Sequence, residues 1–287
     1  MEELTILVNS CDLYEDAWEP FFRLLKIQWP QCANYRIVLN TETKEYFCDF
    51  LQVDTICGGA NIPWAKRLKN VLSKIETEFI VYFLEDFFLM SPVSVKSFEK
   101  AMNLIRNDNS IGYIGLKYNK DHIFKDEKKR DLSQPFFNKD DLVKANRVNS
   151  MTALWRKSWL QSLIRSHETP WEFEIYASKR SKRSEMRVLI INNSVMDPVF
   201  NYEVDLHYGY GISMRKWLPN NKELFEKYGI KVNYDRLGVL DLEKTLNPVN
   251  VGEGQKGLIE RLYIIKKIVK RIPKNIKRTI RIIRSMI

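Results

Sequence analysis

Residues 79–86 read FIVYFLED, six consecutive apolar residues followed directly by Glu85 and Asp86. A continuous apolar run of this length is typical of a strand that is buried on both faces of a sheet. Carboxylates directly after such a strand are costly in free energy unless they are paired or bound to a cation. The stretch therefore predicts a central strand of an α/β sheet with an acidic group at its carboxyl end.

Strand-like and helix-like patterns alternate on both sides of this stretch. Apolar runs typical of strands occupy 4–10, 35–41 and 111–118, and later candidates occupy 151–155 and 188–193. Helical apolar spacing occupies 15–29, 63–75 and 94–108, and helical segments separate the two later strands. This alternation predicts an α/β fold with a mixed, largely parallel sheet flanked by helices.

The positive charge of the chain is concentrated in its last residues. The formal net charge is +10, but ten basic residues and no acid lie in 261–287, which leaves 36 basic and 36 acidic side chains elsewhere. Apolar residues recur there at steps of three and four, which predicts a basic amphipathic helix, or two joined near Pro273. Such a helix is typical of contact with an anionic membrane surface. The alternative is a helix that packs on the body or on a partner.

Other classes of protein fit the sequence less well. The neutral body argues against a nucleic-acid binder, which would carry its own basic face. No leading apolar segment marks a signal peptide, and no apolar run reaches the ~18 residues that span a bilayer. Cys11, Cys32, Cys48 and Cys57 match no paired CxxC metal site. We therefore expect a cytosolic protein with free thiols.

Three segments resemble a family of bacterial GT-A glycosyltransferases from capsule and O-antigen biosynthesis clusters. They are VNSCDLYEDAWEPFFRLLKIQWP (8–30), the WxxRL of residues 64–68, and IVYFLEDFFLM (80–90). The resemblance covers residues 4–120 well, continues more weakly to about 240 and excludes the tail. It implies a GT-A-like, Rossmann-like domain over 1–250, with a nucleotide-sugar half (1–120) and an acceptor half (121–250), followed by a membrane-associating tail (251–287).

The resemblance also implies an activity and a location. The chain would transfer sugar from a nucleotide-sugar donor to a glycan acceptor, which would be lipid-linked, in surface polysaccharide synthesis. Its place would be the cytoplasm, peripheral at the inner face of the cell membrane. The alternative is a non-catalytic, membrane-recruited scaffold that keeps the fold.

In that family an acidic motif, usually Asp-x-Asp, holds Mn²⁺ or Mg²⁺ and the nucleotide diphosphate. The resemblance thus makes Asp86 the metal ligand and Glu85 a contact of the donor sugar or ribose. Glu-Asp without a further acid departs from the Asp-x-Asp motif. The alternative is that both acids cap the next helix or pair with a basic residue.

The remaining donor contacts are expected around the first loop and the helix of 63–75. The resemblance places Asn9, Ser10 and Asp12 toward the nucleotide. Trp64 and Arg67 lie three residues apart, so they share one helix face, and Arg67 would meet the diphosphate. The alternatives are a core position for Trp64 and a solvated surface charge for Arg67.

Candidates for the chemistry lie in two later segments. TPWEFEIY (169–176) offers Glu172 and Glu174 as the carboxylate base that an inverting transfer needs. The alternative is that these acids only occupy the first turn of a helix, where the helix dipole favours negative charge. DLHYGYGISMRKW (205–217) offers His207 as a donor contact, and its glycines permit close approach of a phosphate. The second segment resembles the His-x-x-Gly…Lys-Pro-Trp segment of retaining GT-A enzymes, but its spacing differs and the proline is missing. A glycine-rich turn between strands is the alternative there.

Overall fold

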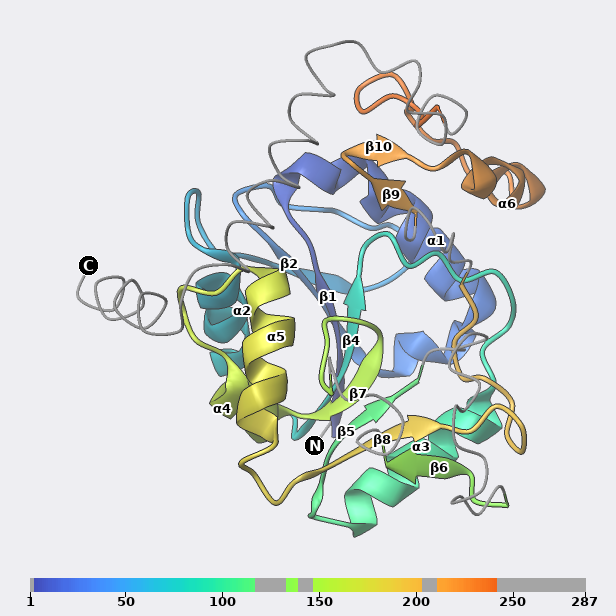
Figure 1. Ribbon diagram of the computed structural model, residues 1–287. Helices are drawn as coiled ribbons and strands as arrows, with labels where there is room; N and C mark the ends of the chain where they lie inside the picture. The colour runs from blue at the N-terminus through green and yellow to red at the C-terminus, as the bar shows by residue number, and fades with distance from the viewer. Residues whose placement is uncertain (1–2, 117–132, 139–146, 203–210, 242–287) are drawn as a thin grey trace, which may run out of the picture. The chain divides into compact units, whose positions relative to one another are not determined.

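The computed structural model of the protein describes residues 3–116, 133–138, 147–202 and 211–241 (Figure 1). The chain divides into two compact units, residues 1–239 and 240–287. Nearly all of the second unit, including the amphipathic tail expected over 261–287, lies outside the described residues. No helix in the described part of the chain is long and apolar enough to cross a membrane.

The first unit is built on an eight-stranded sheet in the order β3-β2-β1-β4-β7-β5-β8-β6. The strands are β1 (Leu4–Asn9), β2 (Arg36–Thr41), β3 (Val53–Cys57), β4 (Phe79–Leu84), β5 (Ile111–Gly115), β6 (Phe136–Asn138), β7 (Ala153–Arg156) and β8 (Arg187–Ile191). Strands β7 and β6 run antiparallel to their neighbours, and the other six run in one direction. The expected mixed, largely parallel sheet is confirmed.

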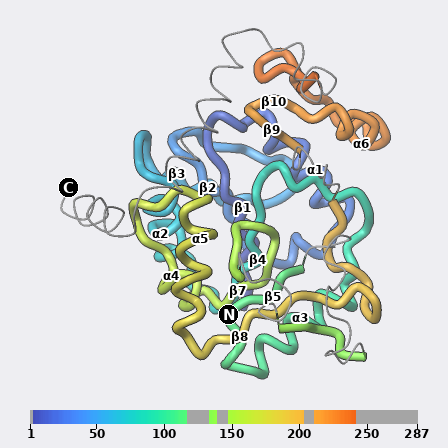
Figure 2. Tube along the Cα trace, viewed as in Figure 1, coloured from blue at the N-terminus to red at the C-terminus, as the bar shows by residue number. Residues whose placement is uncertain are grey.

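Helices cover both faces of this sheet (Figures 1 and 2). The main ones are α1 (Trp18–Gln28), α2 (Trp64–Ser73), α3 (Val95–Asn107), α4 (Lys157–Leu163), α5 (Pro170–Ser181) and α6 (Lys222–Lys227). Apolar residues of α1 and α3 share one core with the sheet, and those of α2, α4 and α5 share the other. A short hairpin, β9 (Ile212–Ser213) and β10 (Lys216–Trp217), precedes α6.

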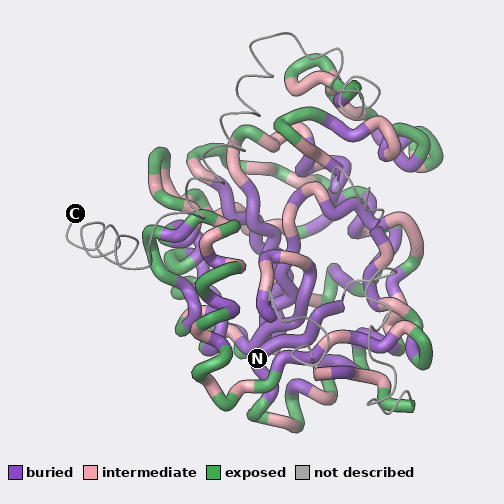
Figure 3. Tube along the Cα trace, in the orientation of Figure 1, coloured by how far each residue is buried: buried purple, intermediate pink, exposed green. Residues whose placement is uncertain are grey.

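Strand β4 occupies the central position that its sequence predicts. Phe79, Val81 and Phe83 lie in the core beneath α1 and α3, whereas Ile80 and Tyr82 lie in the core beneath α2, α4 and α5. Because successive side chains of a strand point to opposite faces, both faces of β4 must be apolar. The buried colour along the centre of the sheet follows this pattern (Figure 3).

Two features of the sheet were not expected from the sequence. Strand β7 lies between β4 and β5 and is antiparallel to both, so consecutive strands of the chain are not neighbours here. Strands β3 and β6 occupy the two edges, each paired with a single neighbour. The residues of β3 are half-buried or exposed, so its sequence lacks the apolar run that marks the central strands.

Candidate functional site

The carboxyl ends of β1, β2 and β4 meet at one edge of the sheet. Asn9 is in register with Asn40 of β2 and with Leu84 of β4, so the loops that follow these strands start side by side. The Asn40 amide donates a 2.6 Å hydrogen bond to the Asn9 side chain, and both residues are buried. Ser10 is also buried, and its hydroxyl accepts a 2.7 Å hydrogen bond from the Trp18 indole. These contacts fix the edge from which the acidic pair projects.

Glu85 and Asp86 follow β4 at this edge without a basic partner. Glu85 is only 5% exposed and Asp86 is half-buried. Within the described part of the chain neither carboxylate forms a salt bridge. The alternative that these acids only pair with a basic residue is therefore not met among the described residues, and a pair of desolvated acids remains at the end of the strand.

The surroundings of the pair favour protonation of both acids. Burial raises the pKa of Glu85 well above its usual value, and the charge of Asp86 raises it further, against smaller opposing effects of Ser10 and Arg67. Burial raises the pKa of Asp86 to about 7, although the backbone N–H of Ile212 favours the charged form. A bound cation would offset this desolvation cost and hold both groups ionised.

The donor set of the pair fits a hard divalent cation that shares its ligands with a substrate. Carboxylate oxygens suit Mg²⁺ and Mn²⁺, and Mg²⁺ is commonly held by one or two carboxylates together with phosphate oxygens and water. The described residues contain no group of three or more His, Cys, Asp or Glu side chains placed to hold a metal ion. The protein would thus supply one or two ligands, and a diphosphate would supply others.

Arg67 is buried at the same edge rather than solvated. Its side chain, 4% exposed, extends from α2, and its Nη1 donates a 3.1 Å hydrogen bond to the carbonyl oxygen of Ser10. Nη2 lies 3.8 Å from the carboxylate of Glu42, and Nε has no hydrogen-bond partner in the described structure. Gly58 leaves room for the stem of Arg67, since a Cβ there would lie 2.8 Å from its Cγ. The guanidinium thus holds the first loop and places positive charge beside Glu85.

Asp12 and Trp64 have structural contacts. The Asp12 carboxylate accepts hydrogen bonds from the backbone N–H groups of Glu42, Thr43 and Lys44, at 3.0 to 3.3 Å. Burial raises its pKa, but a hydrogen bond from the Thr43 hydroxyl and then these backbone bonds outweigh burial and leave the pKa lowered. Trp64 is half-buried, with its ring centroid 5.6 Å from that of Phe173. Asp12 thus fixes the loop after β2, and Trp64 joins α2 to α5.

The segment that begins at Gly211 closes over Asp86. The Gly211 N–H donates a 2.9 Å hydrogen bond to the Asp86 carbonyl, and the Ile212 N–H donates one of 3.4 Å to the Asp86 carboxylate. A Cβ on Gly211 would lie 2.1 Å from a ring carbon of Phe88, so only glycine permits this approach. Gly211, one of the two glycines expected to permit approach of a phosphate, lies against the backbone of Asp86. His207, in the same predicted segment, lies outside the described residues.

The β9–β10 hairpin carries a cation at a strained turn. Met214 and Arg215 have φ values of 49° and 62°, in the left-handed region that non-glycine residues rarely adopt. Strain of this kind commonly persists at functional sites. Burial raises the pKa of Tyr14, the charges of Cys11, Glu85 and Asp86 raise it further, and Arg215 opposes them. Tyr14 was not singled out from the sequence.

The two candidate bases on α5 have different surroundings. Glu172 completes a capping box, because its carboxylate accepts a 3.0 Å hydrogen bond from the Thr169 N–H while its own N–H donates to the Thr169 hydroxyl. Glu174 accepts hydrogen bonds from the N–H and hydroxyl of Ser150, at 3.0 and 2.6 Å. Burial raises the pKa of Tyr82 first, and the charges of Glu85 and then Glu174 add to it. Glu174 thus faces the sheet edge, whereas Glu172 caps the helix.

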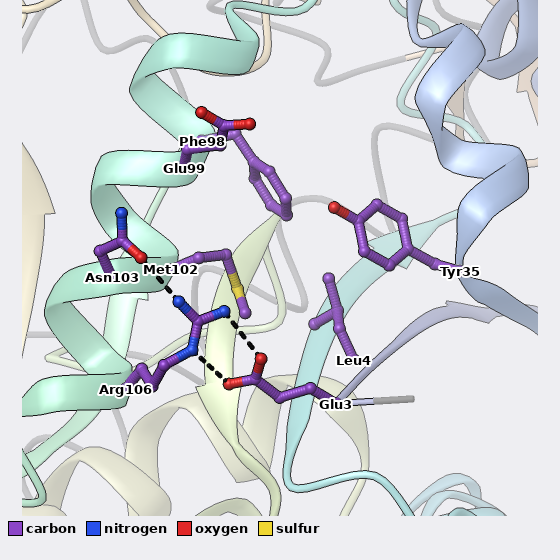
Figure 4. A pocket seen from close by; sticks show the side chains of 8 residues that line it. All are labelled: Glu3, Leu4, Tyr35, Phe98, Glu99, Met102, Asn103 and Arg106. Atoms are coloured by element: carbon purple, nitrogen blue, oxygen red, sulfur yellow. Dashed lines mark hydrogen bonds and ion pairs between the residues drawn. The ribbon is translucent and has the colours of Figure 1, made fainter. Parts of the chain in front are cut away.

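A separate cavity of about 290 Å³ lies near the start of β1, at the end of the strands opposite to the acidic pair (Figure 4). Arg106 makes two 2.7 Å hydrogen bonds to the carboxylate of Glu3 across its rim and another of 2.6 Å to Asn103. Glu3 is thus paired, and Glu99, the other acid of the lining, is exposed to solvent, so the cavity has no buried acid comparable to Glu85. The sheet edge at the end of β4 remains the candidate site.

Comparison with known proteins gives a likeness of fold. No family model matches the chain, and no curated protein matches it. Similar solved structures include S. aureus TarS 1–349 in complex with UDP, at 11% identity and TM-score 0.47, covering 71% of this chain and 60% of that one. A cytidylyltransferase from Leptospira borgpetersenii shares 13% identity at TM-score 0.44, covering 80% and 96% of the two chains. The mannosyltransferase PcManGT from Pyrobaculum calidifontis, in complex with GDP-Man and Mn²⁺, shares 12% identity at TM-score 0.44, covering 66% and 56%. The chain thus spans less than two thirds of TarS 1–349 and of the mannosyltransferase.

Proposed function

We propose that this protein is a glycosyltransferase that takes a sugar from a nucleotide-sugar donor. The observation that carries the proposal is the acidic pair at the carboxyl end of the central strand, a buried Glu85 and a half-buried Asp86, without a basic partner among the described residues. Ligands of open α/β sheets bind beyond the carboxyl ends of the strands. A pair of acids held there is a receptor for a cation that bridges to a diphosphate.

The donor would bind between two positive groups and the acidic pair. Asp86 would hold Mn²⁺ or Mg²⁺ directly, and Glu85 would contact the sugar or ribose. When bound, the cation would supply positive charge that stabilises the diphosphate as it leaves. Arg215 would lie on the outer side of the diphosphate, where its exposed side chain is free to move, and Arg67 would keep the Ser10 loop in place. His207 is a further proposed donor contact.

Glu174 would act as the base in an inverting reaction. The acceptor hydroxyl would lose its proton to the carboxylate as its oxygen bonds to the anomeric carbon, and the bond from that carbon to the diphosphate would break with its electrons. The orientation of Glu174 toward Ser150 and the sheet edge supports this choice. Glu172 stays the second candidate, with its carboxylate already engaged by Thr169.

The acceptor is proposed from the charge of the tail. A stretch with ten basic residues and no acid would attract the chain to anionic lipid, by about 1 kcal/mol for each basic residue near the surface. An enzyme held at the inner face of the cell membrane is suited to a lipid-linked glycan acceptor. We propose a role in bacterial surface polysaccharide synthesis on this basis and on the family resemblance.

Calorimetry and turnover test the proposal together. UDP, GDP and CMP would be titrated with and without Mn²⁺, and hydrolysis of the corresponding sugar nucleotides would be followed. We expect Asp86→Asn to abolish metal-dependent nucleotide binding and turnover, while Glu76→Gln, an exposed acid before the other end of β4, leaves both unchanged. Unaltered turnover in Asp86→Asn would overturn the site.

A non-catalytic scaffold is the second candidate, favoured by one observation. The described residues offer no third acid beside Glu85 and Asp86 for a metal ion. A scaffold would show no metal-dependent binding of any of the three nucleotides, although it would still fold and bind membrane.

A further inference from the structure

Helix α5 exposes more large apolar surface than any other described helix. Trp171, Ile175 and Tyr176 are 74%, 49% and 37% exposed, and they are three of the nine large apolar side chains exposed in the described part of the chain. A cluster of such residues on one element marks an interaction surface more often than single exposed apolar residues do. The trace of α5 alternates between exposed and more buried stretches (Figure 3).

The exposed residues lie on one face of the helix. Trp171, Ile175, Lys179 and Lys182 follow one another at steps of four, four and three, which places them in one line of about 16 Å. The opposite face is already packed, since Phe173, Ala177, Ser178 and Ser181 are buried. The fold of the first unit therefore does not need the outer face of α5 for its core.

The charges of this face indicate what it contacts. Lys179, Lys182 and Arg183 are exposed at the carboxyl end of α5, beyond the exposed apolar residues. Of the nearby acids, Glu172 is held in the capping box and Glu168 is paired with Arg180 at 2.7 Å. Tryptophan with aliphatic residues on one face and lysines beside them is the composition of helices that lie in a membrane interface.

We propose that the outer face of α5, formed by Trp171, Ile175, Tyr176, Lys179, Lys182 and Arg183, docks on an anionic lipid bilayer. Trp171 and Ile175 enter the headgroup region, and the basic residues meet lipid phosphates. The chain's own segment 261–287 is a poorer occupant, because it carries ten basic residues and no acid and is repelled by a basic face. A second copy of this face is repelled for the same reason.

The benefit of this docking surface to the enzyme rests on the proposed function. The exposure and charge that support the surface do not depend on it. The inner side of α5 carries Glu174, the proposed base, hydrogen-bonded to Ser150. Docking of the outer side therefore holds the base at a constant height above the lipid surface. A lipid-linked acceptor then reaches the site without leaving the membrane.

The experiment uses the full chain and vesicles of phosphatidylcholine, with or without phosphatidylglycerol. We expect Trp171→Ser/Ile175→Ser to bind the anionic vesicles about tenfold more weakly than the parent protein. The matched control is Ile27→Ser, which removes an exposed isoleucine (43%) from α1 and should bind as the parent does. Lys179→Glu/Arg183→Glu should weaken binding to the anionic vesicles only.

A depth measurement separates docking of α5 from docking of the tail. Brominated lipid should quench the fluorescence of the bound parent protein, and Trp171→Phe should lose most of that quenching while it stays bound. Equal binding of Trp171→Ser/Ile175→Ser and the parent, or equal quenching of Trp171→Phe and the parent, would overturn the proposal. A dimer that dissociates in Trp171→Ser/Ile175→Ser would overturn it in favour of a second copy. Vesicle binding that depends on Trp171 in a protein that binds no nucleotide would refute the proposed function and leave the docking surface intact.

Discussion

The backbone N–H of Ile212 donates a 3.4 Å hydrogen bond to the carboxylate of Asp86, across 126 residues of sequence. The preceding Gly211 N–H donates to the carbonyl of the same residue. The position of the proposed metal ligand therefore depends on a hairpin that is encoded far from the strand that carries it.

Gly211→Ala should disrupt the site. The added Cβ would lie 2.1 Å from Phe88 and 2.8 Å from the carbonyl oxygen of Asp86, so the hairpin must move away. Overpacking of this kind costs about 1–3 kcal/mol of stability, and we expect metal-dependent nucleotide affinity to fall about tenfold or more. Gly229→Ala is the control, because its φ is +63° with nothing within 4 Å of the added carbon. It should lose about 1 kcal/mol of stability and no nucleotide affinity in calorimetry; an equal loss of affinity in both variants would contradict this role of Gly211.

Asp86→Asn should stabilise the protein at alkaline pH when no metal is present. Burial raises the pKa of Asp86 from 3.8 to about 7. Between these values the unfolded state ionises while the folded state stays protonated, so this group lowers the free energy of unfolding as pH rises from about 4 to 7. Since Asp86 is half-buried, we expect the variant to gain on the order of 2 kcal/mol over the parent at pH 8 and little at pH 4. Urea unfolding with a chelator measures both, and a gain that is the same at both pH values would show that Asp86 is ionised throughout.

Glu174→Gln and Glu172→Ala should separate catalysis from helix capping. Loss of a general base costs about 10²–10⁴-fold in rate, so we expect Glu174→Gln to lower kcat by at least 10²-fold with nucleotide affinity retained. Glu172→Ala should lose about 0.5–1 kcal/mol of stability, because it removes the acceptor of the capping box, and should keep most of kcat. Steady-state kinetics and thermal unfolding on both variants test this assignment, and the reverse pattern of kcat values would transfer the role of base to Glu172.

Arg215→Ala should weaken donor binding without loss of stability. Arg215 is exposed on the strained turn of the β9–β10 hairpin, in which the Ile212 N–H donates to the Asp86 carboxylate. Removal of a charge-assisted contact costs about 1.5–3 kcal/mol, which corresponds to at least tenfold in the Kd for a nucleoside diphosphate with Mn²⁺. Lys222→Ala, an exposed cation at the start of α6, is the control and should bind as the parent does. Equal affinity of Arg215→Ala and the parent would remove Arg215 from the site.

The elements that are encoded locally were predicted well from the sequence. The apolar run of β4 and the helical spacing of α2 and α3 are properties of adjacent residues, and the structure confirms them. The antiparallel direction of β7 was not predicted, because the direction of a strand depends on where its connections cross the sheet. The short edge strands β3 and β6 lack a comparable local signal.

In the candidate site, too, contacts between distant segments were not predicted, whereas a local motif was recognisable. The Asp12 carboxylate is held by Thr43 and Lys44, and these partners come from a loop some thirty residues away, which no local pattern reveals. The burial of Arg67 depends on the Ser10 loop in the same way. The capping role of Glu172 was readable, since Thr169 followed three positions later by Glu is the signature of a capping box.

The position of β7 has a consequence for the synthesis of this protein. A chain that has emerged from the ribosome only as far as β5 has its central strand bare along one side, because the backbone N–H and C=O groups of Phe79 to Tyr82 that face β7 stay unpaired until Ala153–Arg156 arrives. Such an open apolar edge invites pairing with another nascent chain. The first 116 residues, although they contain the acidic pair and the loops around it, are thus expected to aggregate when expressed alone.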